Sequence, residues 1–169
     1  DMLNHAVSSL KAGREPDLSQ PFGVATEINL HLPALLPAAY CADVHERLVI
    51  YKRLANCETL AELEAMQEEL VDRFGNIPPE ARALLESHRL RAIGRPLGVA
   101  RLDATSESIQ LQFVSDPPLD AGKVIGLVQA NRGWRLSGPN RLRIERVTAD
   151  LAERVFHRRR LREILEREF

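Results

Sequence analysis

The spacing of hydrophobic residues changes after Gly98, and that change limits which folds are possible. Up to about residue 97, apart from an alternating stretch at 24–32, apolar side chains recur every three or four residues, as on one face of a helix. After Gly98 they alternate with polar side chains, as in a half-buried strand. The sequence therefore predicts an α+β protein, with an N-terminal helical half followed by a small, mostly antiparallel sheet with packed helices.

Three helices are predicted in the helical half, each with a start signal of its own. Two begin at capping-box pairs and one at two prolines: Asp43 with Glu46, Thr59 with Glu62, and Pro78 with Pro79. The predicted ends are Asn56, Gly75 and about Arg95. The spacing predicts buried faces of Val44, Leu48, Tyr51, Leu54 and Ala55 in the first helix, and of Leu60, Leu63, Leu70, Val71 and Phe74 in the second.

The remaining segments complete the predicted domain organisation. A hairpin is expected from 99–104 and 108–114, then a short helix ending near Asn131, a second strand pair at 134–136 and 141–147, and a closing helix at 148–169. Residues 1–13 are predicted to end an inter-domain helix, and 14–23 to form a linker. Residues 24–169 are predicted to form the domain, with its helical half at about 24–97 and its sheet half at about 98–169. Because a helical pattern is already present at Asp1, we expect the chain to be part of a longer protein.

Composition excludes several classes of protein. The chain has 169 residues, with 23 Lys and Arg against 24 Asp and Glu, so its formal net charge of −1 gives no overall attraction to nucleic acid or to anionic membranes. No apolar run is long enough to span a bilayer, and no secretory leader is present, so a cytoplasmic protein without a membrane partner is expected. Cys41 and Cys57 are expected to be reduced thiols, with a single disulfide as the alternative.

The motifs that carry catalysis are missing from the sequence. Gly122 and Lys123 are not preceded by the glycine of a Walker loop, and Val124 stands where a magnesium-binding hydroxyl is needed. The five histidines and two cysteines have no metal-ligand spacing, and no nucleophile elbow occurs. We therefore expect no catalytic residues, no metal and no cofactor, and an isolated domain that is a monomer.

One candidate binding surface is acidic and lies on the second predicted helix. From Glu58 to Asp72 there are six acidic residues and no basic one. Helical geometry places Glu69 and Asp72 opposite the core face. The small residues Ala61 and Ala65 lie beside them, and the carboxylates of Glu62 and Glu68 flank them. This surface could receive arginine side chains of a partner. The alternative is a solvated acidic face that binds nothing.

The other candidate surface is basic. Arginines gather near the end of the sheet half around one tryptophan: Arg132, Arg135, Arg141, Arg143 and Trp134. On the strand from 141, Leu142 and Ile144 are predicted to face inward and the arginines outward. A nucleic-acid contact with one stacking aromatic is possible here. The alternative is a solvated strand with Trp134 in the core.

Three spaced motifs resemble one known family. They are Thr26-Glu-Ile-Asn-Leu-His-Leu-Pro-Ala-Leu-Leu-Pro37, Arg47-Leu-Val-Ile-Tyr-Lys-Arg-Leu-Ala55, and Glu69-Leu-Val-Asp-Arg-Phe-Gly75 with Ile77-Pro-Pro79. In this order they resemble the C-terminal domain of the bacterial transcription-repair coupling factors. The similarity covers essentially the whole chain, with departures at Gln20–Gly23, at Asp116–Asp120 and in the last predicted helix.

The resemblance implies a function for the domain and for its parent. The family's parent protein is an ATP-dependent DNA translocase that binds double-stranded DNA, displaces stalled RNA polymerase, and recruits nucleotide excision repair through UvrA. Its C-terminal domain is implied to be regulatory: it packs on the N-terminal UvrA-binding module and keeps the protein autoinhibited until RNA polymerase is engaged. The family's acidic contact corresponds to Glu69 and Asp72, so the resemblance favours partner binding at these residues.

Overall fold

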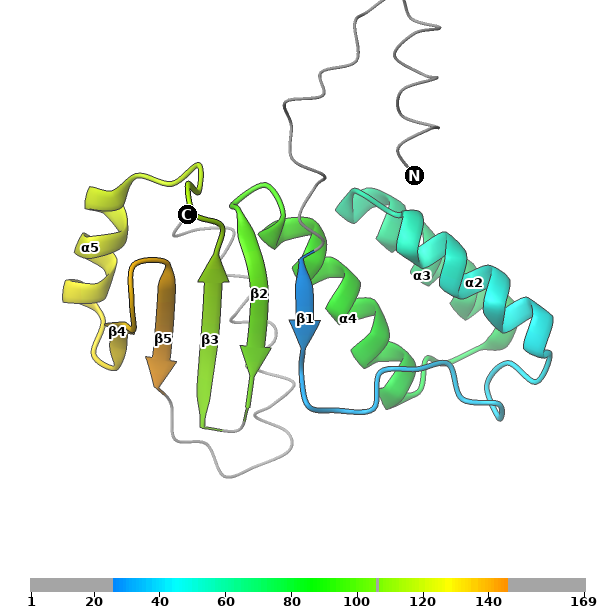
Figure 1. Cartoon of the computed structure of the whole chain (residues 1–169). Coiled ribbons are helices and arrows are strands. Elements are labelled where there is room, and N and C mark those ends of the chain that lie inside the picture. The colour runs from blue at the N-terminus through cyan, green and yellow to red at the C-terminus, as the bar shows by residue number, and fades with distance from the viewer. Residues whose placement is uncertain (1–25, 106, 146–169) are drawn as a thin grey trace, which may run out of the picture.

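The structure is a computed structural model that describes residues 26–105 and 107–145 (Figure 1). In chain order its elements are β1 (Glu27–Asn29), α2 (Val44–Asn56), α3 (Leu60–Phe74), α4 (Pro79–Gly94), β2 (Val99–Ala104), β3 (Ser108–Phe113), α5 (Ala121–Ala130), β4 (Trp134–Leu136) and β5 (Arg141–Glu145). These bounds confirm the helices and strands predicted between 43 and 145. The predicted helix at 1–13, the linker at 14–23 and the closing helix at 148–169 lie outside the described residues.

The five strands form one mixed sheet in the order β1-β2-β3-β5-β4. β1 pairs with β2 in parallel, whereas β2 with β3, β3 with β5 and β5 with β4 pair antiparallel. The mostly antiparallel sheet of an α+β fold is therefore confirmed. The alternating stretch predicted at 24–32 contributes only three residues, Glu27–Asn29, to this sheet. β1 forms an edge strand of the sheet, although it precedes α2, α3 and α4 in the sequence.

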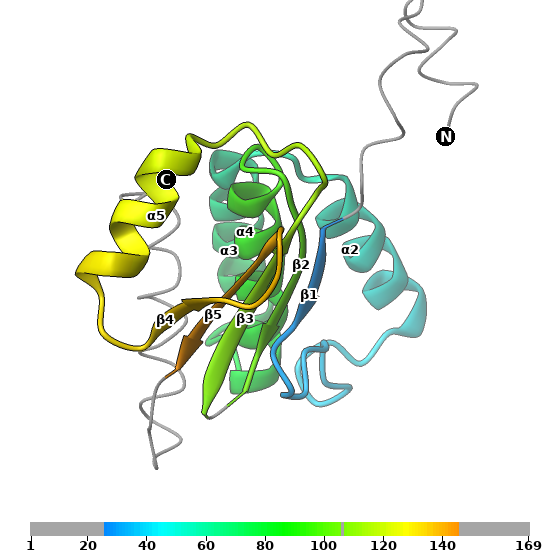
Figure 2. The same cartoon turned by 60° about the vertical axis from the view of Figure 1, so that its left-hand side comes forward.

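Two hydrophobic cores meet at α4. In the sheet core, Leu90 of α4 packs with strand residues that include Leu102, Leu111 and Leu142. In the helical core, Leu85 of α4 packs with buried residues of α2 and α3. Figure 1 shows α2 and α3 side by side, and both helices contact α4. Both views show α5 near β4 (Figures 1 and 2). Because α4 contributes to both cores, it connects the helical half to the sheet half.

Capping fixes the limits of α3, the helix that carries the acidic residues. Thr59 accepts a hydrogen bond from the backbone N–H of Glu62 at 3.2 Å, and the Glu62 carboxylate accepts one from the backbone N–H of Thr59 at 3.1 Å. This is the reciprocal capping box that the sequence predicts. At the other end Gly75 has a φ of 82°, a conformation that favours glycine, and its N–H donates to the carbonyl of Val71.

The buried face of α2 was predicted only in part, because Leu54 is buried as predicted but Val44 and Leu48 are not. Val44 and Leu48 are each 61% exposed, whereas Ile50 and Leu54 are almost fully buried. At 100° per residue, Leu48 lies 200° around the helix from Ile50, on the side away from the core. Two apolar stripes fit the same helical spacing, and only the packing of α2 against its neighbours decides between them. In the same way Val71 of α3 is 42% exposed, and Met66 takes its predicted place in the core.

Candidate interaction surfaces

The outer side of α3 presents an acidic surface to solvent. Ala61, Ala65, Glu68 and Asp72, which we call the acidic face, are all exposed. Within the described ranges, neither carboxylate of this face makes a hydrogen bond or an ion pair. The spacing of i and i+4 brings Glu68 and Asp72 close together, and the two alanines leave room beside them. Both acidic residues are therefore open to a cationic partner.

Glu69 lies at the boundary between α3 and α2 rather than on the acidic face. Its two carboxylate oxygens accept hydrogen bonds from the Arg53 guanidinium of α2, at 2.7 and 2.6 Å. Arg73 donates to the same carboxylate at 3.2 Å and also pairs with Glu46 of α2. The sequence predicted Glu69 on the exposed side with Asp72, and this orientation was wrong because α2 lies along that edge of α3.

The Arg53–Glu69 pair changes the chemistry of the carboxylate. The side chains of Arg53 and Glu69 are 46% and 33% exposed. Hydrogen bonds from Arg53 lower the pKa of Glu69 and raise that of Arg53. Glu69 is thus held ionised with both oxygens engaged, and a partner cation reaching it would have to share it with Arg53.

The Glu62 carboxylate caps the N-terminus of α3. This carboxylate accepts the backbone N–H of Glu58 at 2.8 Å in addition to that of Thr59. These backbone hydrogen bonds lower the pKa of Glu62. Of the four acidic residues named from the sequence, Glu68 and Asp72 therefore present carboxylates to solvent, while Glu62 and Glu69 are engaged within the domain.

Sequence reasoning missed the cations that surround Glu69. Arg53 lies in the last turn of α2 and Arg73 in the last turn of α3. The short connection between the two helices was the available signal. A short loop makes α2 and α3 antiparallel neighbours, and this places the end of α2 beside α3. Which acidic residue of α3 pairs with Arg53 depends on the rotation of both helices about their axes, and the spacing of residues alone does not determine this rotation.

The basic surface has the strand alternation that the sequence predicts. Leu142 and Ile144 of β5 are 1% and 4% exposed, while Arg141 and Arg143 lie on the opposite face. Arg135 of β4 is the cross-strand partner of Arg143, so it belongs to the same face. Glu145 lies 3.7 Å from Arg135 and 3.6 Å from Arg143, and it neutralises part of their charge.

Trp134 is separated from these arginines. It pairs with Ile144 in the β4–β5 register and packs against the sheet core. Side chains on directly paired residues share a face of the sheet, so Trp134 lies on the face opposite Arg141 and Arg143. Arg132 is exposed in the turn before β4. The predicted combination of arginines with a stacking aromatic on one surface is therefore not assembled.

The described residues include both cysteines of the chain, and neither a metal-ligating cluster nor a helix that could span a membrane. Cys41 is buried, Cys57 is partly exposed, and both are free thiols. Residues 26–105 and 107–145 contain no group of three or more His, Cys, Asp and Glu side chains that could hold a metal ion. Over the same residues, no helix has the length and apolar character needed to cross a membrane.

Comparison with known proteins identifies the family. A family model described as the TRCF domain matches residues 30–124, more than half of the chain. This chain belongs to the TRCF domain family. The transcription-repair-coupling factor of Escherichia coli K12 is 40% identical over 155 residues, which make up 91% of this chain and 13% of that protein. The factor of Haemophilus influenzae is 37% identical over 151 residues, 89% of this chain and 13% of that protein.

A solved structure supports the same fold for this TRCF domain. The crystal structure of a C-terminal domain of transcription-repair coupling factor matches with a TM-score of 0.70 at 22% identity, covering 85% of this chain and 93% of that one. At this level of identity the match shows the fold. The chain spans about an eighth of the length of the full relatives named above.

Proposed function

We propose that this TRCF domain is a non-catalytic regulatory module of an ATP-dependent DNA translocase that couples transcription to nucleotide excision repair. In this proposal the domain docks on the N-terminal, UvrA-binding module of its parent protein in the bacterial cytoplasm. Docking hides the UvrA-binding surface until the parent engages RNA polymerase on double-stranded DNA. Family membership and the likeness to a C-terminal domain support this assignment. The missing phosphate-binding loop supports a domain that does not hydrolyse ATP itself.

The acidic face is the observation that carries the docking proposal. Glu68 and Asp72 project from α3 without a partner in the described part of the chain, and Asp72 belongs to the Glu69-Leu-Val-Asp72 motif that resembles the family's acidic contact. Like charges at i and i+4 are destabilising in an isolated helix, so a partner's cations would relieve a cost that the free domain carries. Guanidinium groups suit this role because they pair with carboxylates through two hydrogen bonds.

The strength of docking is set by its intramolecular character. A tethered domain meets its partner at an effective concentration of about 1 mM. Keeping the closed form at about 99% then requires a ratio of about 100 between closed and open forms, or about 2.7 kcal/mol. The same contact between separate molecules would have a dissociation constant of about 10 μM. Docking of this strength is weak enough to be released when another partner binds.

Removing the two carboxylates of the acidic face tests the proposal in the full-length parent. We expect Glu68→Ala combined with Asp72→Ala to open the N-terminal module and raise UvrA affinity, measured by titration. Glu107→Ala combined with Asp116→Ala is the matched control, because it removes two exposed carboxylates from outside α3. If the first variant folds normally but binds UvrA no better than the control, the acidic face is not the docking site.

A further inference from the structure

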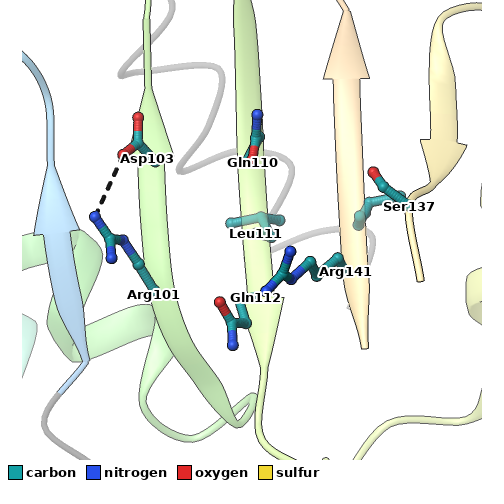
Figure 3. Close-up of a pocket in the computed structure, with 8 residues that line it drawn as sticks. Arg101, Asp103, Gln110, Leu111, Gln112, Ser137 and Arg141 are labelled. Carbon is teal, nitrogen blue, oxygen red and sulfur yellow. Dashed lines mark ion pairs between the residues drawn. The ribbon is translucent and has the colours of Figure 1, made fainter. Parts of the chain in front are cut away.

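The side of the sheet that faces away from α4 is hollowed. The hollow has a volume of about 260 Å³ and crosses β2, β3 and β5. Figure 3 shows its polar lining, which consists of Arg101, Asp103, Gln110, Gln112, Ser137 and Arg141. On β3, Gln110 and Gln112 alternate with the buried residues Ile109, Leu111 and Phe113, which face the sheet core. The hollow is therefore a feature of the polar face of the sheet.

The charged groups at one end of the hollow are already paired with one another. The carboxylate of Asp103 lies 3.8 Å from the guanidinium of Arg101 and 2.7 Å from Nε2 of His31. Arg101 also lies 3.8 Å from Glu27 of β1. The charges at this end are engaged with one another.

The other end keeps its polar groups available. Arg141 extends from β5 toward Gln112, its cross-strand neighbour on β3 (Figure 3). Between residues 26 and 145, with residue 106 left aside, the side chains of Arg141, Gln110, Gln112 and Ser137 have no hydrogen-bond or ion-pair partner. A guanidinium, two amides and a hydroxyl thus converge on one hollow with their hydrogen-bonding capacity unused.

We propose that this hollow binds an extended peptide segment that carries an acidic side chain, with its carboxylate on Arg141 and its backbone along β3. Gln110 and Gln112 are two residues apart on β3, which corresponds to a spacing of about 6.7 Å along the strand. In an extended peptide, every second peptide group has the same spacing. Each amide side chain has both a donor and an acceptor, which a peptide group requires. The planar guanidinium of Arg141 supplies two parallel donors for a carboxylate. This site is distinct from the acidic face and its proposed function.

The charges on this face favour a peptide over a nucleic acid. Four arginines share the face with three carboxylates, for a formal balance of only +1: Arg101, Arg135, Arg141 and Arg143 against Glu27, Asp103 and Glu145. Repeated phosphates would meet Asp103 and Glu145, whereas one carboxylate can sit at Arg141 alone. Single-stranded nucleic acid also needs stacking aromatics. The described part of this face has none, because Trp134 lies on the other side.

Amide NMR spectra of the 169-residue chain provide the test. The probe is a capped peptide of sequence Ala-Ala-Glu-Ala-Ala, and the comparison peptide has Gln in place of Glu. We expect saturable shifts at 110–112, 137 and 141 with the acidic peptide, and at least fivefold weaker binding of the neutral one. Arg141→Gln should abolish this difference. Arg132→Gln, which removes an exposed arginine outside the hollow, should retain it.

Three results would overturn the proposal. The first is no saturable shift with the acidic peptide. The second is equal binding of both peptides to the wild-type chain. The third is stronger shifts of the same residues with a 12-base-pair DNA duplex, with an affinity that falls steeply as salt rises; this would assign the face to nucleic acid. None of these readouts depends on UvrA, so this proposal and the docking of the acidic face succeed or fail separately.

Discussion

The carboxylate of Glu69 accepts two hydrogen bonds from the Arg53 guanidinium of α2. A carboxylate that accepts two parallel hydrogen bonds from one guanidinium is fixed in direction as well as in charge. Arg53 therefore positions Glu69 along the α2–α3 boundary. Asp72, three residues further along the same helix, has no such restraint among the described residues. A partner of the acidic face would therefore meet Asp72 as a free acceptor, with Glu69 held aside at the boundary with α2.

Replacing Arg53 measures how much the Arg53–Glu69 pair contributes to the free energy of unfolding. We expect Arg53→Gln to raise the pKa of Glu69 toward its ordinary value and to lower the free energy of unfolding at pH 7 by about 0.5 to 1 kcal/mol, as for a partly exposed pair. Since the folded pKa of Glu69 is depressed, its contribution is present above the unfolded value of about 4.3 and is lost as pH falls through the folded pKa. In urea unfolding, the difference in the free energy of unfolding between wild type and Arg53→Gln should therefore be smaller at pH 3.5 than at pH 7.

Arg95→Gln is the matched control for this measurement. Arg95 lies 3.7 Å from Glu58, and both side chains are more than half exposed, so we expect almost no change in stability. A loss with Arg53→Gln that is as large at pH 3.5 as at pH 7 would mean that packing of the Arg53 stem matters, and that the ion pair does not.

At the scale of single elements, local signals predicted most of this fold. The limits of α3 follow from Thr59, Glu62 and Gly75, whose interactions are confined to neighbouring residues. The faces of β3 and β5 follow from strict alternation. In each case the information lies within one segment, so the sequence was sufficient.

Features that depend on two segments were harder to predict. The side of α2 that packs, the rotation of Glu69 toward Arg53, and the parallel pairing of β1 with β2 are all set by contacts between distant residues. The same cause separates Trp134 from the arginines, because their faces depend on the β4–β5 register. The candidate site was accordingly predicted at the level of its helix, and only in part at the level of its side chains.

A buried histidine makes the stability of α4 sensitive to pH. His88 is 9% exposed, and Nδ1 of its ring lies 3.4 Å from the Arg91 guanidinium. Burial, and next the charge of Arg91, lowers the pKa of His88 to about 4. Because this folded value lies below the unfolded value of about 6.5, stability is fully present above pH 6.5 and is lost as pH falls toward 4. Allowing for solvent screening, we expect a loss of about 1 to 2 kcal/mol over that window.

Urea unfolding at pH 7 and pH 5 tests this expectation. His88→Leu should reduce the difference between the two pH values, since it removes the group that the unfolded state protonates. The exposed His45 of the same half provides the control, and His45→Gln should leave the difference as in the wild type. If His88→Leu retains the full pH dependence, another group is responsible for it.

At the scale of the whole molecule, α4 determines whether the two halves behave as one unit. Its residues lie in both cores, with Leu85 at 1% and Leu90 at 0% exposure. If the helical half unfolded, α4 would lose its packing partners there, and the side chains that α4 contributes to the sheet core would no longer be held in place. A shared element of this kind favours a single cooperative transition over two independent ones.

A substitution in one half, observed from the other, tests this coupling. Leu54 of α2 is fully buried in the helical core, and we expect Leu54→Ala to lower the free energy of unfolding by about 2 to 5 kcal/mol. Trp134 is the single tryptophan of the sequence and packs against the sheet core, so its fluorescence reports on the other half. If α4 couples the halves, the urea midpoint of this fluorescence shifts as far as that of the helical circular dichroism signal. Leu48→Ala, at a 61% exposed position of the same helix, should change the free energy of unfolding from either signal by less than about 0.5 kcal/mol. A circular dichroism midpoint that moves while the Trp134 midpoint stays would show that the two cores unfold separately and that α4 does not bind them into one unit.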